Sequence, residues 1–72
     1  MSVETTYKIN GMTCGHCAQA VTGELTLLTG VRSVDVDVPA GTATVTSDAP
    51  LTVDDVRAAV DEAGYELAGV SA

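Results

Sequence analysis

The amino-acid sequence predicts an α+β fold in which two helices cover one face of a four-stranded antiparallel sheet. Three observations support this prediction. Apolar residues alternate with polar residues in three segments, and a fourth short segment near the end is partly apolar, so four strands are expected. In two longer segments the apolar residues recur every three or four positions, which is the helical period. Tyr7 and Tyr65 are the only aromatic residues, so the core must be aliphatic. Valine dominates the aliphatic residues, and it favours strands.

The N-terminal third predicts a strand followed by a helix. Alternation over residues 3–9 gives the strand, and Asn10 and Gly11 interrupt it. The helix begins at Gly15, and Gly30 is placed as its C-terminal cap. One helical face carries four residues spaced four, four and three apart: Cys17, Val21, Leu25 and Leu28.

The remaining sequence predicts a hairpin, a second helix and a last strand. Strands over 34–38 and 42–46 flank a turn at 39–41 that contains proline and glycine. Thr52 followed by Asp55 resembles a capping box at the start of the second helix. Its apolar face is formed by Val53, Val56, Val60 and Ala63, and Gly64 ends it. The last strand is expected over 65–70.

The resulting order, βαββαβ, is that of the ferredoxin-like arrangement, in which both helices lie on the same face of the antiparallel sheet. Residues 1–72 are expected to form a single domain, because 72 residues are few for one domain and no linker or low-complexity segment divides them. The two βαβ halves have the same order of elements without sharing a sequence repeat.

Net charge excludes some classes of partner. The formal net charge is −7, and the only basic side chains are the scattered Lys8, Arg32 and Arg57. Nucleic-acid binding and attraction to anionic lipid both require clustered basic residues, so neither is expected. The acidity itself is explained by solubility, or alternatively by a partner with a basic surface.

The expected location is cytoplasmic. The N-terminus lacks a basic segment followed by an apolar run, and no apolar stretch approaches the roughly 20 residues that span a membrane. In a reducing compartment two close cysteines indicate metal or redox chemistry rather than a structural disulfide. The chain has two, Cys14 and Cys17.

These cysteines belong to the segment Gly-Met-Thr-Cys-Gly-His-Cys, between the first predicted strand and the first predicted helix. Two cysteines separated by two residues at a helix start can direct both sulfurs at one ion. The amides of a helix N-terminus favour thiolates there. Two thiolates without a third strong ligand suit a soft monovalent ion of low coordination number, and Cu(I) fits that description.

This heptapeptide, within a short βαββαβ chain, resembles the heavy-metal-associated (HMA) domain family, and more narrowly its bacterial soluble copper chaperones. The resemblance extends over nearly the whole chain. It implies that Cys14 and Cys17 are the two Cu(I) ligands. It also implies a partner, the metal-binding domain of a copper-transporting P-type ATPase, to which copper passes by thiol ligand exchange. A copper-bridged homodimer is a further implication, and no enzyme activity is expected.

Three further residues match family positions around the metal. Met12 corresponds to a side chain that packs beneath the metal loop rather than binding. His16 corresponds to a histidine that lies beside the ligands and occasionally binds when two molecules share copper. Tyr65 corresponds to an aromatic residue that approaches the metal loop from the opposite loop, and plain packing is an equal alternative for it.

Other functions remain open at this stage. The chain could be a detached N-terminal metal-binding domain of a copper ATPase, although a start at Met1 favours a free chaperone. A dithiol oxidoreductase also uses this cysteine spacing, but the chain is short for that fold and has no Trp beside the motif. A structural zinc site would need four ligands, and the two cysteines with His16 supply at most three. A mercury-handling member of the family is the remaining alternative, although its periplasmic versions carry a signal peptide.

Overall fold

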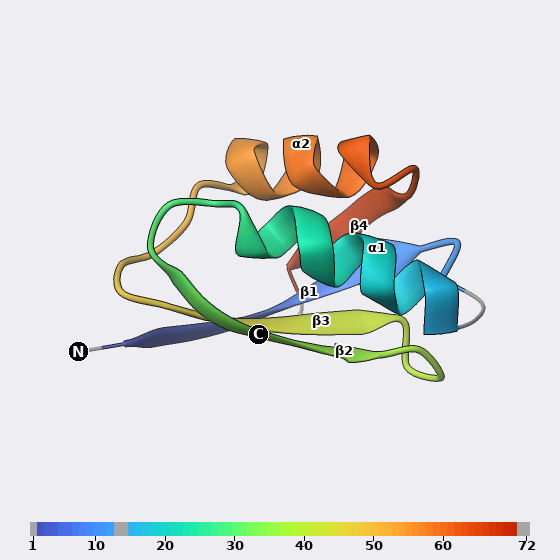
Figure 1. The fold of residues 1–72 in the computed structure, drawn as a ribbon, viewed down its shortest axis with the longest axis horizontal. Helices are drawn as coiled ribbons and strands as arrows, with labels where there is room; N and C mark the ends of the chain where they lie inside the picture. The colour runs from blue at the N-terminus through green and yellow to red at the C-terminus, as the bar shows by residue number, and fades with distance from the viewer. Residues whose placement is uncertain (1, 13–14, 71–72) are drawn as a thin grey trace.

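The computed structural model describes residues 2–12 and 15–70, and it has the predicted order and fold (Figure 1). Along the chain the elements are β1 (Val3–Asn10), α1 (Gly15–Thr26), β2 (Val31–Asp37), β3 (Thr42–Ser47), α2 (Val53–Glu62) and β4 (Glu66–Val70). The two helices lie together on one face of the sheet, and the other face is left open (Figure 1). Both the element order and the placement of the helices agree with the sequence-based prediction.

The sheet has the strand order β2-β3-β1-β4, and every neighbouring pair is antiparallel. The N-terminal strand β1 is therefore an interior strand. Its pairing with β4 changes register between Lys8 and Ile9, where a bulge shifts the ladder close to the end of β1. Bulges bend a strand and re-aim the residues beyond them. The extra residue here is Ala68 of β4, which has no partner between the pairs Lys8–Gly69 and Ile9–Leu67.

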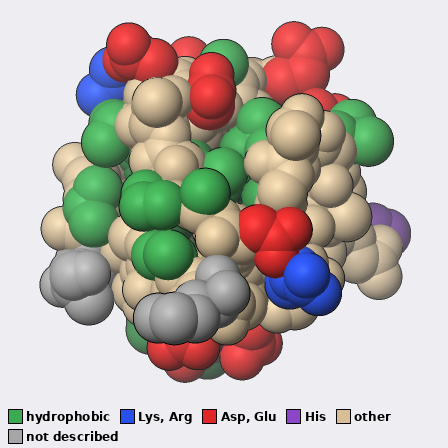
Figure 2. All heavy atoms as spheres, turned by 90° about the vertical axis from the view of Figure 1, so that its left-hand side faces the viewer, with side chains coloured by type: hydrophobic (Ala, Val, Ile, Leu, Met, Phe, Trp, Pro, Cys, Tyr) green, Lys and Arg blue, Asp and Glu red, His purple; other side chains and the backbone are tan. Residues whose placement is uncertain are grey.

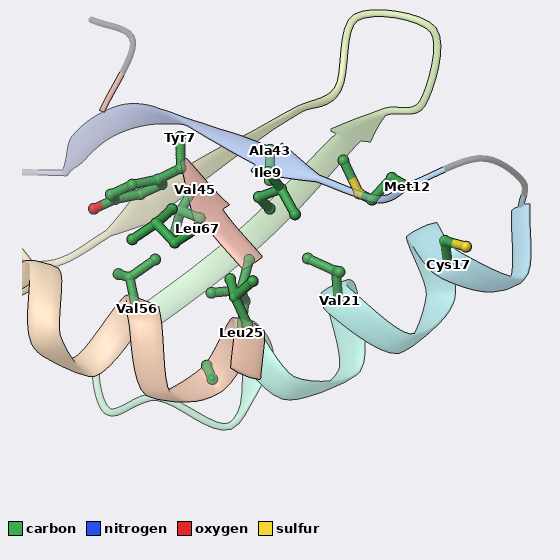
Figure 3. Packing of buried hydrophobic residues seen from close by; sticks show 12 residues of the cluster. Tyr7, Ile9, Met12, Cys17, Val21, Leu25, Ala43, Val45, Val56 and Leu67 are labelled. Atoms are coloured by element: carbon green, nitrogen blue, oxygen red, sulfur yellow. The ribbon is translucent and has the colours of Figure 1, made fainter. Parts of the chain in front are cut away.

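The core lies between the sheet and the helices (Figure 3). Because side chains alternate along a strand, each strand turns one apolar row inward. The sheet contributes Tyr7, Ile9, Ala43, Val45 and Leu67. The helices contribute Cys17, Val21, Leu25, Val56, Ala59 and Val60, and Met12 joins them from the loop after β1. On the open face the hydroxyls of Thr6 and Thr44 form a hydrogen bond of 3.0 Å between β1 and β3.

Helix α2 is capped at both ends by its own sequence. At the N-terminus the Thr52 hydroxyl accepts a hydrogen bond of 3.2 Å from the Asp55 amide, as the predicted capping box requires. At the C-terminus the Gly64 amide donates to the Asp61 carbonyl at 2.9 Å, and the Tyr65 amide donates to the Val60 carbonyl at 3.0 Å. These two bonds form a Schellman motif, whose reversal of chain direction needs a left-handed residue. Gly64 supplies it with φ +93°.

Some element boundaries differ from the prediction. β2 begins at Val31 rather than residue 34, because Val31 pairs with Ser47 across an irregular register that alternation alone does not reveal. α1 ends at Thr26, so Leu28 packs on the core from a turn rather than from the helix. Val53, predicted on the buried face of α2, is 41% exposed, and Ala59 is buried in addition to Val56 and Val60.

The end of the molecule at the left of Figure 1 is partly apolar. The C-terminal end of α1 and the N-terminal end of α2 both lie there. Leu27, which follows α1, and Val53, the first residue of α2, are exposed. Figure 2 views this end, and hydrophobic side chains gather in its middle with acidic side chains around them. No helix in the described part of the chain is long and apolar enough to cross a membrane.

Candidate metal site

The described residues of the cysteine motif lie at the opposite end of the molecule, where β1 ends and α1 begins (Figure 1). β1 ends at Asn10, and Gly11 turns the chain with φ +91°. Met12 follows, and α1 begins at Gly15. Thr13 and Cys14 lie outside the described residues, so the assignment of Cys14 as a ligand stays a prediction.

Cys17 is the third residue of α1 and is only 7% exposed. It belongs to the hydrophobic core cluster, at the end nearest the loop between β1 and α1 (Figure 3). The helical period explains this burial, since Val21 and Leu25 continue the same buried face one and two turns later. The thiol is therefore held by a regular, well-packed element rather than by a loop.

The electrostatic environment at the start of α1 suits a negatively charged side chain such as a thiolate. A helix N-terminus carries a partial positive charge from its unpaired amides. The first turn of α1 contains no carboxylate, although the chain has ten, whereas the first turn of α2 contains Asp54 and Asp55. The positive end of α1 is thus left to the residues of the cysteine motif, where it favours the thiolate form that binds soft metal ions.

Met12 and His16 have different environments. Met12 is 7% exposed and packs within the core cluster, as a side chain that supports the loop would. His16, the second residue of α1, is exposed. Their roles near a bound ion stay predictions.

The turn between α2 and β4 approaches the loop from the other side. The Tyr65 ring lies so close to Gly11 that its Cδ1 atom would be 3.4 Å from a β-carbon placed there. Next to this contact, the Asn10 side-chain amide donates a hydrogen bond of 3.3 Å to the Glu66 carboxylate. The structure therefore places the Tyr65 ring beside Gly11, and the role of Tyr65 near a bound ion stays a prediction.

Within residues 2–12 and 15–70, no three side chains of His, Cys, Asp or Glu are grouped closely enough to hold a metal ion together. The same residues enclose no pocket for a small organic ligand. The chemistry that the described site offers is that of a soft sulfur donor at a positive helix end.

Comparison with known families decides what kind of domain this is. The profile of the heavy-metal-associated domain matches residues 6–66. The chain belongs to this family. As a heavy-metal-associated domain it shares 36% of its residues with the copper chaperone CopZ of Bacillus subtilis, over 90% of this chain and 96% of that protein. It shares 35% with the human copper-transporting ATPase 2, over 93% of this chain but only 5% of the ATPase.

Solved structures support the fold of this heavy-metal-associated domain independently. The crystal structure of oxidised MerP from Ralstonia metallidurans is similar, with a TM-score of 0.86 and 32% identity over the full length of both chains. The helix and strand arrangement described above is therefore the arrangement of the family.

Two residues of this region were not singled out as functional by the sequence. The sequence predicts Gly11 as the end of the first strand and the start of the heptapeptide, and Gly64 as the end of the second helix. Their shared left-handed conformation follows from the turns they make, but the closeness of Gly11 to Tyr65 depends on how β1 and β4 pair. Such a long-range relation leaves no local signal in the chain.

Proposed function

We propose that this heavy-metal-associated domain is a copper carrier of the cytoplasm that binds one Cu(I) through Cys14 and Cys17. The observation that supports it most directly is the Cys17 thiol, buried in the first turn of a helix whose positive end has no carboxylate. The names of the relatives agree with copper as the metal, since they include a copper chaperone matched over almost its whole length. Met12, His16 and Tyr65 would surround the ion without binding it.

Delivery would proceed by exchange of thiolates. A thiolate of the partner attacks the two-coordinate ion, one new copper–sulfur bond forms, and a bond to Cys14 or Cys17 then breaks. The copper stays Cu(I) throughout, so no electron is transferred and the chain acts as a carrier rather than an enzyme. The proposed partner is the metal-binding domain of a copper-transporting P-type ATPase, a class to which one of the relatives belongs. The copper-bridged homodimer stays a prediction.

The test is a competition for Cu(I) against a chromogenic chelator. We expect the unaltered chain to take up one Cu(I) per monomer. The variant with both Cys14→Ser and Cys17→Ser should lose tight binding, because a hydroxyl is a poor ligand for a soft ion. Ser33→Ala changes an exposed residue of β2, outside the cysteine motif, and is the control for effects of mutation and purification that do not involve the site. Tight binding by the double variant would refute the proposed site.

A second candidate is a metal-binding module of a longer transporter, which the similarity to an ATPase favours. In that case residues 1–72 would still act as one domain. The mass of the natural gene product separates the two candidates. A polypeptide near 7.3 kDa in the cell supports the free carrier, and a much larger one supports the module.

A further inference from the structure

An asparagine–glycine pair, Asn10 and Gly11, stands where β1 ends. Asn10 is the only asparagine of the chain, and Gln19 carries the only other side-chain amide. Asparagine is one of the thermolabile residues of proteins, because the backbone nitrogen of the next residue can attack its side-chain carbonyl carbon. Glycine has no β-carbon to crowd that nitrogen. The one asparagine of the chain is therefore followed by the residue that hinders this attack least.

The fold leaves the reacting atoms of this pair accessible. Asn10 is exposed, and its pairing with Glu66 is the last of the β1–β4 ladder. Gly11 follows the ladder and is also exposed. The extended backbone of a strand holds the next nitrogen away from the side chain, so the attack requires the strand end to open. Such ends open at a free energy far below that of global unfolding.

One hydrogen bond restrains the Asn10 side chain. Its amide nitrogen donates to a carboxylate oxygen of Glu66 at 3.3 Å, across the strand pair. An amide nitrogen donates, whereas an ionised carboxylate only accepts. A carboxylate at residue 10 would therefore lose this bond. It would also set two negative charges opposite each other, which destabilises a strand pair.

We propose that Asn10 is a site of spontaneous modification, and that its product, a carboxylate facing Glu66, loosens the end of the β1–β4 ladder. The Gly11 nitrogen bonds to the side-chain carbonyl carbon of Asn10. The bond from that carbon to the amide nitrogen breaks, and ammonia leaves with the proton of the Gly11 amide. Water then opens the resulting succinimide ring at either carbonyl, which gives aspartate or isoaspartate. The net change is uptake of water and loss of ammonia, without electron transfer or a metal ion.

The first test follows the metal-free chain in warm, mildly alkaline buffer. Mass spectrometry of the intact chain measures loss of an amide, and fragmentation of the tryptic peptide 9–32 assigns the loss to one residue. We expect aspartate and isoaspartate at residue 10, with Gln19 intact because its side chain would have to close a larger ring. Asn10→Gln is the matched control and should lose no amide. Absence of isoaspartate at residue 10 in the unaltered chain would overturn the proposal.

The second test compares the folded chain with the chain unfolded in guanidinium chloride. We expect the folded chain to react no more than about tenfold more slowly, because the end of a ladder opens easily. A rate slower by a factor of about a thousand or more would mean that only global unfolding exposes the site, and would overturn modification of the native chain. In guanidinium chloride Gly11→Ala should react several times more slowly than the unaltered chain, since backbone strain plays no part there. Equal rates would overturn attack by the nitrogen of residue 11.

The third test measures the consequence with Asn10→Asp, which carries the aspartate product from the start. Urea denaturation should show that the ratio of folded to unfolded chain falls by about two- to fivefold, the effect of one unfavourable cross-strand pair. Adding Glu66→Gln should restore most of the loss, because glutamine can donate to the new carboxylate. Glu4→Gln, which neutralises another exposed carboxylate beside the sheet, is the matched control and should not restore it. An undiminished ratio in Asn10→Asp, or equal restoration by both glutamines, would overturn the loosening.

Discussion

At the scale of single residues, the described part of the proposed metal site contains one buried sulfur, that of Cys17, and one exposed ring, that of His16. Cys17 is held within the core by the helical face it shares with Val21. His16, one position earlier, is exposed. A helix turns about 100° per residue, so neighbours in sequence face different surroundings. The roles of the two residues toward a metal ion should therefore be unequal.

The variant His16→Ala tests this inequality. We expect the dissociation constant for Cu(I) to change by less than about tenfold, or about 1.4 kcal/mol, because the two sulfurs are proposed to make the metal bonds. Gln19→Ala, which removes another exposed polar side chain from α1, is the control. Chelator competition measures both variants. A loss of several orders of magnitude in His16→Ala alone would make the imidazole a ligand.

Sequence reasoning reached the residues of the site more easily than their relations. The spacing of Cys14 and Cys17 is local, so it was visible in the chain. Tyr65 and Gly11 are more than fifty residues apart in the sequence, and their closeness in space follows from the β1–β4 pairing. The resemblance to the family suggested that closeness, whereas no pattern of composition or period could have done so. The same limit explains why β2 was predicted to start three residues late.

At the scale of single elements, α1 contains a residue that weakens it. Gly23 is exposed in the helix interior, has an ordinary helical backbone, and a β-carbon there would meet no atom within 4 Å. Glycine in such a place costs free energy because its unfolded backbone has more freedom to lose.

We therefore expect Gly23→Ala to raise the free energy of unfolding by about 0.5–1 kcal/mol. Gly30→Ala should lower it by about 1–2 kcal/mol, since Gly30 has φ +87° and alanine is strained there. Urea denaturation of the two variants measures both changes. Shifts of the same sign would contradict this account of the two glycines.

At the scale of the whole molecule, stability depends on a small aliphatic core. Leu25 is completely buried beneath the sheet, whereas Leu27, two residues later, is 77% exposed. Truncation of a buried leucine removes apolar contact and leaves a cavity, whereas truncation of an exposed one does neither. The two leucines form a matched pair in one short segment.

We expect Leu25→Ala to lower the free energy of unfolding by about 2–5 kcal/mol. Leu27→Ala should change it by less than about 0.5 kcal/mol. Urea denaturation is again the measurement. The total free energy of unfolding of a domain of this size is only about 4–10 kcal/mol, so the alanine variant can fail to fold. In that case Leu25→Met replaces it in the comparison, with an expected loss of stability below about 1.5 kcal/mol. Equal losses for residues 25 and 27 would contradict the described core.

The described core is formed by buried side chains of the sheet and both helices that pack against one another. The metal-free chain should therefore be folded, unlike small domains that need their metal to fold. Far-ultraviolet circular dichroism should show nearly the same helix and strand content before and after addition of Cu(I). A metal-free spectrum typical of an unfolded chain would refute this expectation.

The interior place of β1 has a consequence for how the protein is made. β1 is made before the other five elements, yet its two neighbours in the sheet are β3 and β4, and β4 ends only at residue 70. Synthesis of residues 11–70 takes about 3–12 seconds at ordinary rates of translation. Until β4 is made, one edge of β1 lacks its native partner and can pair with another chain nearby, which is how unpaired strands begin to aggregate. Glu4 and Lys8 are exposed on the face that later stays open, and charged residues at such positions oppose pairing of this kind.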